Sequence, residues 1–100
     1  MNLIDAWFHV EREVNGKSIA QALRDLNEAT GLKARINKVY GWRDNSARAP
    51  DAATYHMRIV VMRHAFFLAN ININYLSERQ ILTMADVLSP PLREEYKNLI

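Results

Sequence analysis

Apolar residues recur along this chain at intervals of three or four, which is the spacing of amphipathic α-helices rather than of β-strands. The first segment carries this spacing at Leu3, Trp7, Val10 and Val14. It predicts a helix over residues 3–14, capped by Asn2 and ended by Asn15 and Gly16. Only three glycines and three prolines interrupt 100 residues. We therefore predict an all-α fold, a compact bundle of five to six helices in a single domain over residues 1–100.

Two Ser-x-x-Gln patterns, at residues 18–21 and 77–80, predict two further helix starts. In such a capping box the serine and the glutamine satisfy backbone N–H groups at the start of the helix. The first of these helices carries an apolar stripe at Ile19, Leu23 and Leu26. It is expected to end near Ala29, before Gly31.

A long helix is predicted from Pro50 to about Asn70, because proline is tolerated at a helix start. One side carries Tyr55, Ile59, Met62 and Phe66, and the apolar surface is widened by Val60, Val61 and Phe67. This width predicts burial on two sides, one of which a second chain could cover. Residues 70–74 alternate like an extended connector, and residues 89–91 are expected to end the following helix and start a short terminal one.

Positive charge is concentrated in one window of the chain, residues 33–48. Its five basic residues face a single acid, Asp44, so the window has a net charge of +4 whereas the whole chain has +2. The basic residues are Lys33, Arg35, Lys38, Arg43 and Arg48. This concentration indicates a polyanionic partner for this part of the surface.

A short helix from Leu32 or Lys33 to Tyr40 is predicted inside this window, followed by a loop over residues 41–49. If Ile36 points inward, a helical wheel places Leu32, Val39, Tyr40 and Arg43 near it. The opposite, outward face is small, basic and amide-bearing, and consists of Ala34, Arg35, Asn37, Lys38 and Gly41. Arginine, lysine and asparagine are the side chains that contact phosphates and read base edges in the major groove. A solvated helix surface is the alternative interpretation of the same pattern.

The order of these parts over residues 17–64 resembles the helix-turn-helix of phage repressor and Cro-type regulators. The resemblance rests on the aromatic and basic run Tyr40-Gly41-Trp42-Arg43 and on the proline that follows in Arg48-Ala49-Pro50. It implies a helix-turn-helix over about residues 18–40, with residues 32–40 as the recognition helix and Arg43 and Arg48 as phosphate contacts. The apolar pair Ile36 and Val39 follows Gly31 one residue earlier than in that family. This spacing indicates a turn shortened by one residue, or an irregular or winged variant.

Other chemistry finds little support in the sequence. The chain has no cysteine, which excludes disulfides and thiolate sites and fits a reducing cytoplasm. His9 and Glu13 stand one helical turn apart without a third ligand, so we expect no metal site. No phosphate-binding loop or nucleophile motif is present, and we expect neither a cofactor nor an enzymatic activity. No leader segment and no membrane span of about 18 residues is evident.

The sequence thus predicts a cytoplasmic transcriptional regulator, of the phage-repressor type, that binds double-stranded DNA through Lys33, Ala34, Arg35, Asn37, Lys38, Arg43 and Arg48. We expect a homodimer, since two copies about 34 Å apart read two half-sites. Residues 66–100 are rich in apolar side chains and form the candidate dimer surface. The alternative is a small protein-binding inhibitor or adaptor, which the apolar excess over residues 59–88 would suit.

Overall fold

The computed structural model describes residues 2–68, 70 and 76–87. The described helices are α1 (Leu3–His9), the π-helical η1 (Val10–Val14), α2 (Ile19–Thr30), α3 (Ile36–Arg43), α4 (Asp51–Leu68) and α5 (Glu78–Val87). Within these ranges the structure contains no strand. The predicted all-α fold is therefore confirmed. None of the described helices is long and apolar enough to cross a membrane.

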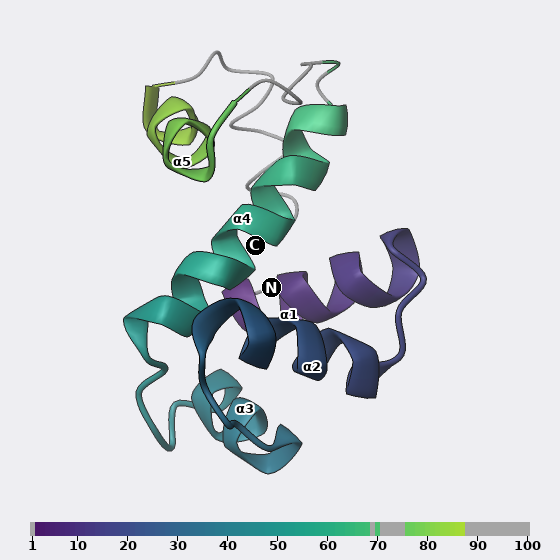
Figure 1. Ribbon diagram of the computed structural model, residues 1–100, viewed down its shortest axis with the longest axis vertical. Helices are drawn as coiled ribbons and strands as arrows, with labels where there is room; N and C mark the ends of the chain where they lie inside the picture. The colour runs from purple at the N-terminus through teal and green to yellow at the C-terminus, as the bar shows by residue number, and fades with distance from the viewer. Residues whose placement is uncertain (1, 69, 71–75, 88–100) are drawn as a thin grey trace.

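The long helix α4 connects the two ends of the molecule (Figure 1). Helices α1 and α2 pack against α4, and α5 packs against its C-terminal half. Helix α3 lies at one end of the long axis and α5 at the other (Figure 1). Other helices of the same chain thus cover much of the apolar width of α4, but Phe67 is 74% exposed. The buried residues of α4 are Ala53, Met57, Ile59, Val61, Met62, Ala65 and Phe66.

The core lies where α1 and α2 meet α4, and α3 adds to it from its place against α1. Trp7 and Phe66 are its largest fully buried side chains. Leu26 of α2 and Val39 of α3 are also fully buried. Tyr55 was expected on the buried side of α4, but 42% of its surface is exposed. The other residues predicted on that side of α4, Ile59, Met62 and Phe66, are buried.

Local capping predictions are confirmed where the interacting groups are neighbours in sequence. The Asn2 side chain accepts a hydrogen bond from the N–H of Asp5, at 2.9 Å. The box at the start of α5 is fully formed, because the Ser77 hydroxyl accepts from the Gln80 N–H and the Gln80 amide accepts from the Ser77 N–H. Only half of the box at residues 18–21 forms. The Ser18 hydroxyl caps α2, but the side chain of Gln21 bonds Asp25 and Arg24 instead.

The helix predicted over residues 3–14 is α-helical only as far as His9 and continues as η1. The Asn15 N–H bonds the carbonyl of Val10, five residues back, which is the pairing of a π-helix. A wider turn rotates the later residues relative to the apolar stripe. As a result Val14, expected to be buried, is 44% exposed, and Glu11 is 1% exposed.

Residues 71–74 of the predicted connector 70–74 lie outside the described residues, as do residues 89–91, which were predicted to end one helix and start a short terminal one. The same holds for residues 88–100 of the candidate dimer surface.

His56 is a half-buried side chain on α4, in a hollow bordered by Thr30 of α2 and Glu78 of α5. Burial lowers the pKa of His56, while the charges of Glu11, Glu78 and Asp25 act in the opposite direction and that of Lys17 adds to the lowering. Its Nε2 atom is buried and has no hydrogen-bond partner among the described residues. The fold therefore favours the neutral imidazole.

This environment predicts a loss of stability in mild acid. Because the pKa of His56 is lower in the folded than in the unfolded chain, its stabilising contribution is present above the unfolded value of about 6.5 and is lost as pH falls below it. We expect the free energy of urea unfolding to fall between about pH 7 and pH 5. His56→Gln should reduce this dependence, whereas His9→Gln, at an exposed position, should retain it. If the free energy of unfolding depends equally on pH in both variants, His56 is not the source of the dependence.

Candidate nucleic-acid interface

Residues 31–35 form a non-helical connection between α2 and α3, which we call the arm. Gly31 leaves α2 in the left-handed conformation, with φ of 73°, which glycine adopts without steric cost. Along the arm the side chains then alternate. Leu32 and Ala34 are half-buried against the core, whereas Lys33 and Arg35 are exposed. The backbone of Arg35 is extended, with φ of −98° and ψ of 161°.

The boundaries predicted for the helix over residues 32–40 are wrong, because its first residues lie in the arm. Helix α3 begins at Ile36, not at residue 32 or 33, and it ends at Arg43, inside the segment predicted as a loop. The connection is five residues long and is therefore not a shortened turn. Ala34 was predicted on the outward face of a helix, but it lies in the arm and packs toward the core. Side chains in an extended segment alternate between two faces, so the wheel does not apply to residues 32–35.

The arm is tied to α2 by side chains of α2. The Asn27 amide donates to the Ala34 carbonyl and accepts from the Ala34 N–H, both at 3.0 Å. The Thr30 hydroxyl donates to the Leu26 carbonyl and accepts from the Leu32 N–H. Neither role was predicted. The available signal was a helix-terminal asparagine and threonine before a glycine, residue types that bond nearby backbone.

Helix α3 turns its apolar side toward the body and its polar side outward. Val39 and Trp42 are buried, while Asn37 and Lys38 are exposed. The wheel correctly placed Val39 inward and Asn37 and Lys38 outward. Gly41, predicted outward, is half-buried, and a Cβ built there would lie 3.0 Å from the Ser46 hydroxyl.

The N-terminus of α3 differs from those of the other described α-helices. Its N-cap residue, Arg35, makes no side-chain cap, and its first turn contains no acidic residue. The N-termini of the other four have a capping side chain, an acidic first turn or both. No described residue accepts a hydrogen bond from the N–H of Ile36 or of Asn37. The positive end of this helix dipole is therefore uncompensated.

Three cations surround this helix start. Lys33 and Arg35 extend from the arm, and Lys38 from the first turn of α3. Lys33 and Lys38 line the same small hollow, of about 180 Å³, together with Trp42. None of the three forms an ion pair with a described residue. We call this group, together with Asn37, the α3 basic cluster.

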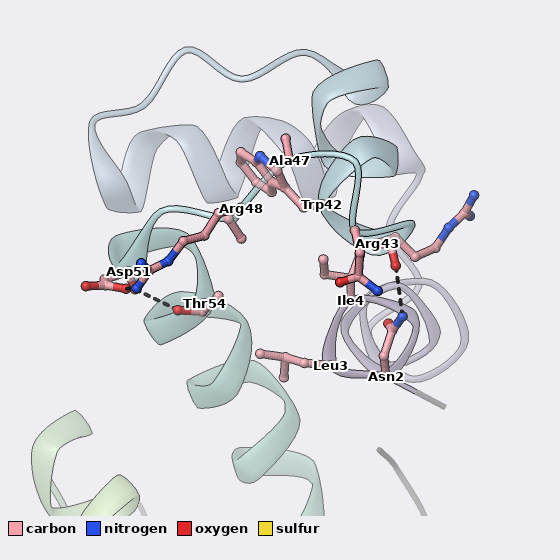
Figure 2. Close-up of a pocket in the computed structure, with 11 residues that line it drawn as sticks. Asn2, Leu3, Ile4, Trp42, Arg43, Ala47, Arg48, Asp51 and Thr54 are labelled. Atoms are coloured by element: carbon pink, nitrogen blue, oxygen red, sulfur yellow. Dashed lines mark hydrogen bonds and ion pairs between the residues drawn. The ribbon is translucent and has the colours of Figure 1, made fainter.

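Arg43 and Arg48 lie at a different place. They border a hollow of about 440 Å³ between the starts of α1 and α4 and the end of α3 (Figure 2). The Arg43 guanidinium points away from this hollow, bonds Asp44 at 2.9 Å and lies 4.8 Å from the centre of the Tyr40 ring. That hydrogen bond lowers the pKa of Asp44. Arg48 is largely exposed and lies 3.8 Å from Asp51. Both arginines thus have acidic partners, unlike the cations of the α3 basic cluster.

Among the described residues, no three histidine, aspartate or glutamate side chains are grouped so that they could hold a metal ion. No protein-family model, curated protein or solved structure matches this chain. The function is therefore to be inferred from the chain's own residues and their geometry.

Proposed function

We propose that this protein binds double-stranded DNA through the α3 basic cluster and acts as a transcriptional regulator. The observation that carries the proposal is that three cations without an ion-pair partner among the described residues lie beside a helix N-terminus without a side-chain cap. Exposed N–H groups and a positive dipole end favour phosphate groups. A phosphate-rich polymer would compensate the positive charge of the side chains and that of the helix end.

The members of the cluster suit different parts of a DNA groove. Arg35 and Asn37 carry the donor and acceptor groups that recognise guanine and adenine edges. Lys33 and Lys38, on either side of them in sequence, suit phosphate contacts. Helix α3 has eight residues and is therefore about 12 Å long, comparable to the width of the major groove. Its place at one end of the molecule leaves this surface open to a duplex (Figure 1).

We propose a cytoplasmic regulator that resembles phage repressors in the order of its parts, in which a basic helix, α3, follows α2. The five-residue arm departs from the three- or four-residue turn of the helix-turn-helix motif. DNA binding does not require that turn, because the cations and the helix start that carry the proposal belong to the arm and to α3.

A homodimer would extend the short reading surface of α3 to two half-sites. Exposed apolar residues at the C-terminal end of α4 support a contact between copies there. Phe67 is 74% exposed and Leu68 is 42% exposed. The same two residues would suit the alternative, a protein-binding adaptor without DNA binding.

Selection of bound sequences from a random duplex pool tests the proposal. Enrichment of a palindromic site would support both DNA binding and the dimer. Absence of enrichment, together with no salt-sensitive retention on mixed-sequence DNA, would contradict DNA binding and favour the adaptor.

The double variant Arg35→Ala/Lys38→Ala is expected to weaken DNA binding by at least about tenfold. The slope of log affinity against log salt concentration should decrease by about 1, since Lys38 is the phosphate contact that is removed, while the loss of Arg35 removes a contact to a base edge. Fluorescence anisotropy with a labelled duplex at several salt concentrations measures both quantities.

A matched control removes two arginines far from the cluster. Arg12→Ala/Arg79→Ala changes the net charge equally, at exposed positions of η1 and α5. Its salt slope should match the wild-type slope. If both double variants lose affinity equally, binding depends on overall charge and the cluster is not the interface.

A further inference from the structure

We infer that Asn27 is a positioning residue for DNA binding, which holds the arm so that Lys33 and Arg35 face the duplex together. This inference rests on the proposed function and adds to it a residue of α2 outside the basic cluster. Asn27 is half-buried, and its amide bonds both backbone groups of Ala34.

The two hydrogen bonds control the backbone on both sides of Ala34. The N–H of Ala34 belongs to the peptide unit shared with Lys33, and its carbonyl to the unit shared with Arg35. Fixing both groups therefore fixes the orientation of the two flanking residues. Because side chains alternate along extended backbone, Lys33 and Arg35 then project to the same side while Ala34 packs inward.

The remaining backbone of the arm has few other restraints. At its start the Gly31 N–H bonds the Asn27 carbonyl at 2.8 Å and the Leu32 N–H bonds the Thr30 hydroxyl at 3.3 Å. At its end the Arg35 carbonyl accepts from the first turn of α3. The N–H groups of Lys33 and Arg35 have no hydrogen-bond acceptor among the described residues. Ala34 is thus the central point at which the arm is attached to α2.

Asparagine suits this role for a chemical reason. Its side chain offers one donor and one acceptor on the same carbon, which matches the N–H and carbonyl of a single extended residue. Alanine offers neither group. A preorganised arm binds more tightly because less conformational freedom is lost when the complex forms.

A double-mutant cycle tests the inference. Anisotropy with a labelled mixed-sequence duplex at low salt is measured for four proteins: wild type, Asn27→Ala, Lys33→Ala/Arg35→Ala, and the triple variant. We expect Asn27→Ala to weaken binding by about tenfold in the wild-type background and by less than about twofold when Lys33 and Arg35 are already absent. A purely structural role would lower affinity equally in both backgrounds, and that result would overturn the inference.

Backbone amide exchange measured by NMR gives a second readout. The Ala34 N–H should be protected in the wild type and should exchange faster in Asn27→Ala, while the central amides of α2 stay protected. Asn15→Ala is the matched control, since Asn15 bonds Glu11 away from the arm. It should leave both DNA affinity and Ala34 exchange unchanged. An unprotected Ala34 N–H in the wild type would also overturn the inference.

A second variant covers the case in which Asn27→Ala unfolds α2. Ala34→Pro removes the N–H donor from the arm and leaves the sequence of α2 intact. It should show the same coupling to Lys33→Ala/Arg35→Ala. If the wild type itself does not bind DNA, the proposed function fails and this inference fails with it. If the wild type binds and the coupling is absent, only the role of Asn27 is refuted.

Discussion

Replacing Lys17 with methionine is expected to lower the free energy of unfolding by about 3 kcal/mol. The Lys17 ammonium bridges two carboxylates, at 3.0 Å from Glu11 and 2.8 Å from Asp25. Glu11 is only 1% exposed, and its other oxygen accepts from the Asn15 amide at 2.6 Å. Although burial opposes it, bonding to Asp25 and Glu11 raises the pKa of Lys17. Without Lys17, a buried carboxylate loses its counter-charge.

Urea unfolding followed by tryptophan fluorescence measures this loss. The control is the double variant Glu11→Leu/Lys17→Met, which removes the buried Glu11 carboxylate together with its counter-charge. Replacing a buried ion pair with apolar side chains is often neutral, so the double variant should recover most of the stability lost in the single one. If Lys17→Met unfolds at the wild-type urea concentration, the bridge between η1 and α2 contributes no net stability.

Trp42→Ala is expected to destabilise the protein by about 3 to 4 kcal/mol. Val39 and Trp42 are the two buried side chains of α3, and Trp42 is the larger of them. Its indole N–H has no hydrogen-bond partner among the described residues. Trp42→Phe therefore loses only packing volume and should cost less than the alanine variant.

Thermal unfolding by circular dichroism compares the two Trp42 variants with Lys38→Ala. Lys38 lies on the same helix but is exposed, so its replacement should change stability by less than about 0.5 kcal/mol. DNA affinity should instead fall more in Lys38→Ala than in Trp42→Phe. A Trp42→Ala protein as stable as the wild type would show that α3 is held mainly by other contacts.

The fold was predictable from sequence where the interactions are local. The helix starts near Asn2, Ser18 and Ser77 depend on groups no more than three residues apart. The π-helical segment was not predictable from apolar spacing. Val10 and Val14 are four residues apart whether the turn is regular or wide, and the buried partner of Lys17 becomes evident only once η1 and α2 are packed together.

The candidate site was predicted in its residue types but not in its geometry. Lys33 and Arg35 were recognised by charge, and their exposure is as expected. The alternation of Leu32, Ala34 and Ile36 is too short to be distinguished from helical spacing. The extended course of the arm is held by the two hydrogen bonds between Asn27 and Ala34, which are seven residues apart. These bonds form only once the arm lies along α2.

The arm is attached to α2 through its main chain. Asn27 contacts the main chain of Ala34, and main-chain atoms are the same whatever side chains stand beside them. Positions 33 and 35 can therefore change identity without altering the hydrogen bonds that hold them. If the protein binds DNA as proposed, exchange of these two solvent-facing residues alters its contacts with the duplex on an unchanged scaffold. A library randomised at positions 33 and 35 would sample such changes while keeping the fold.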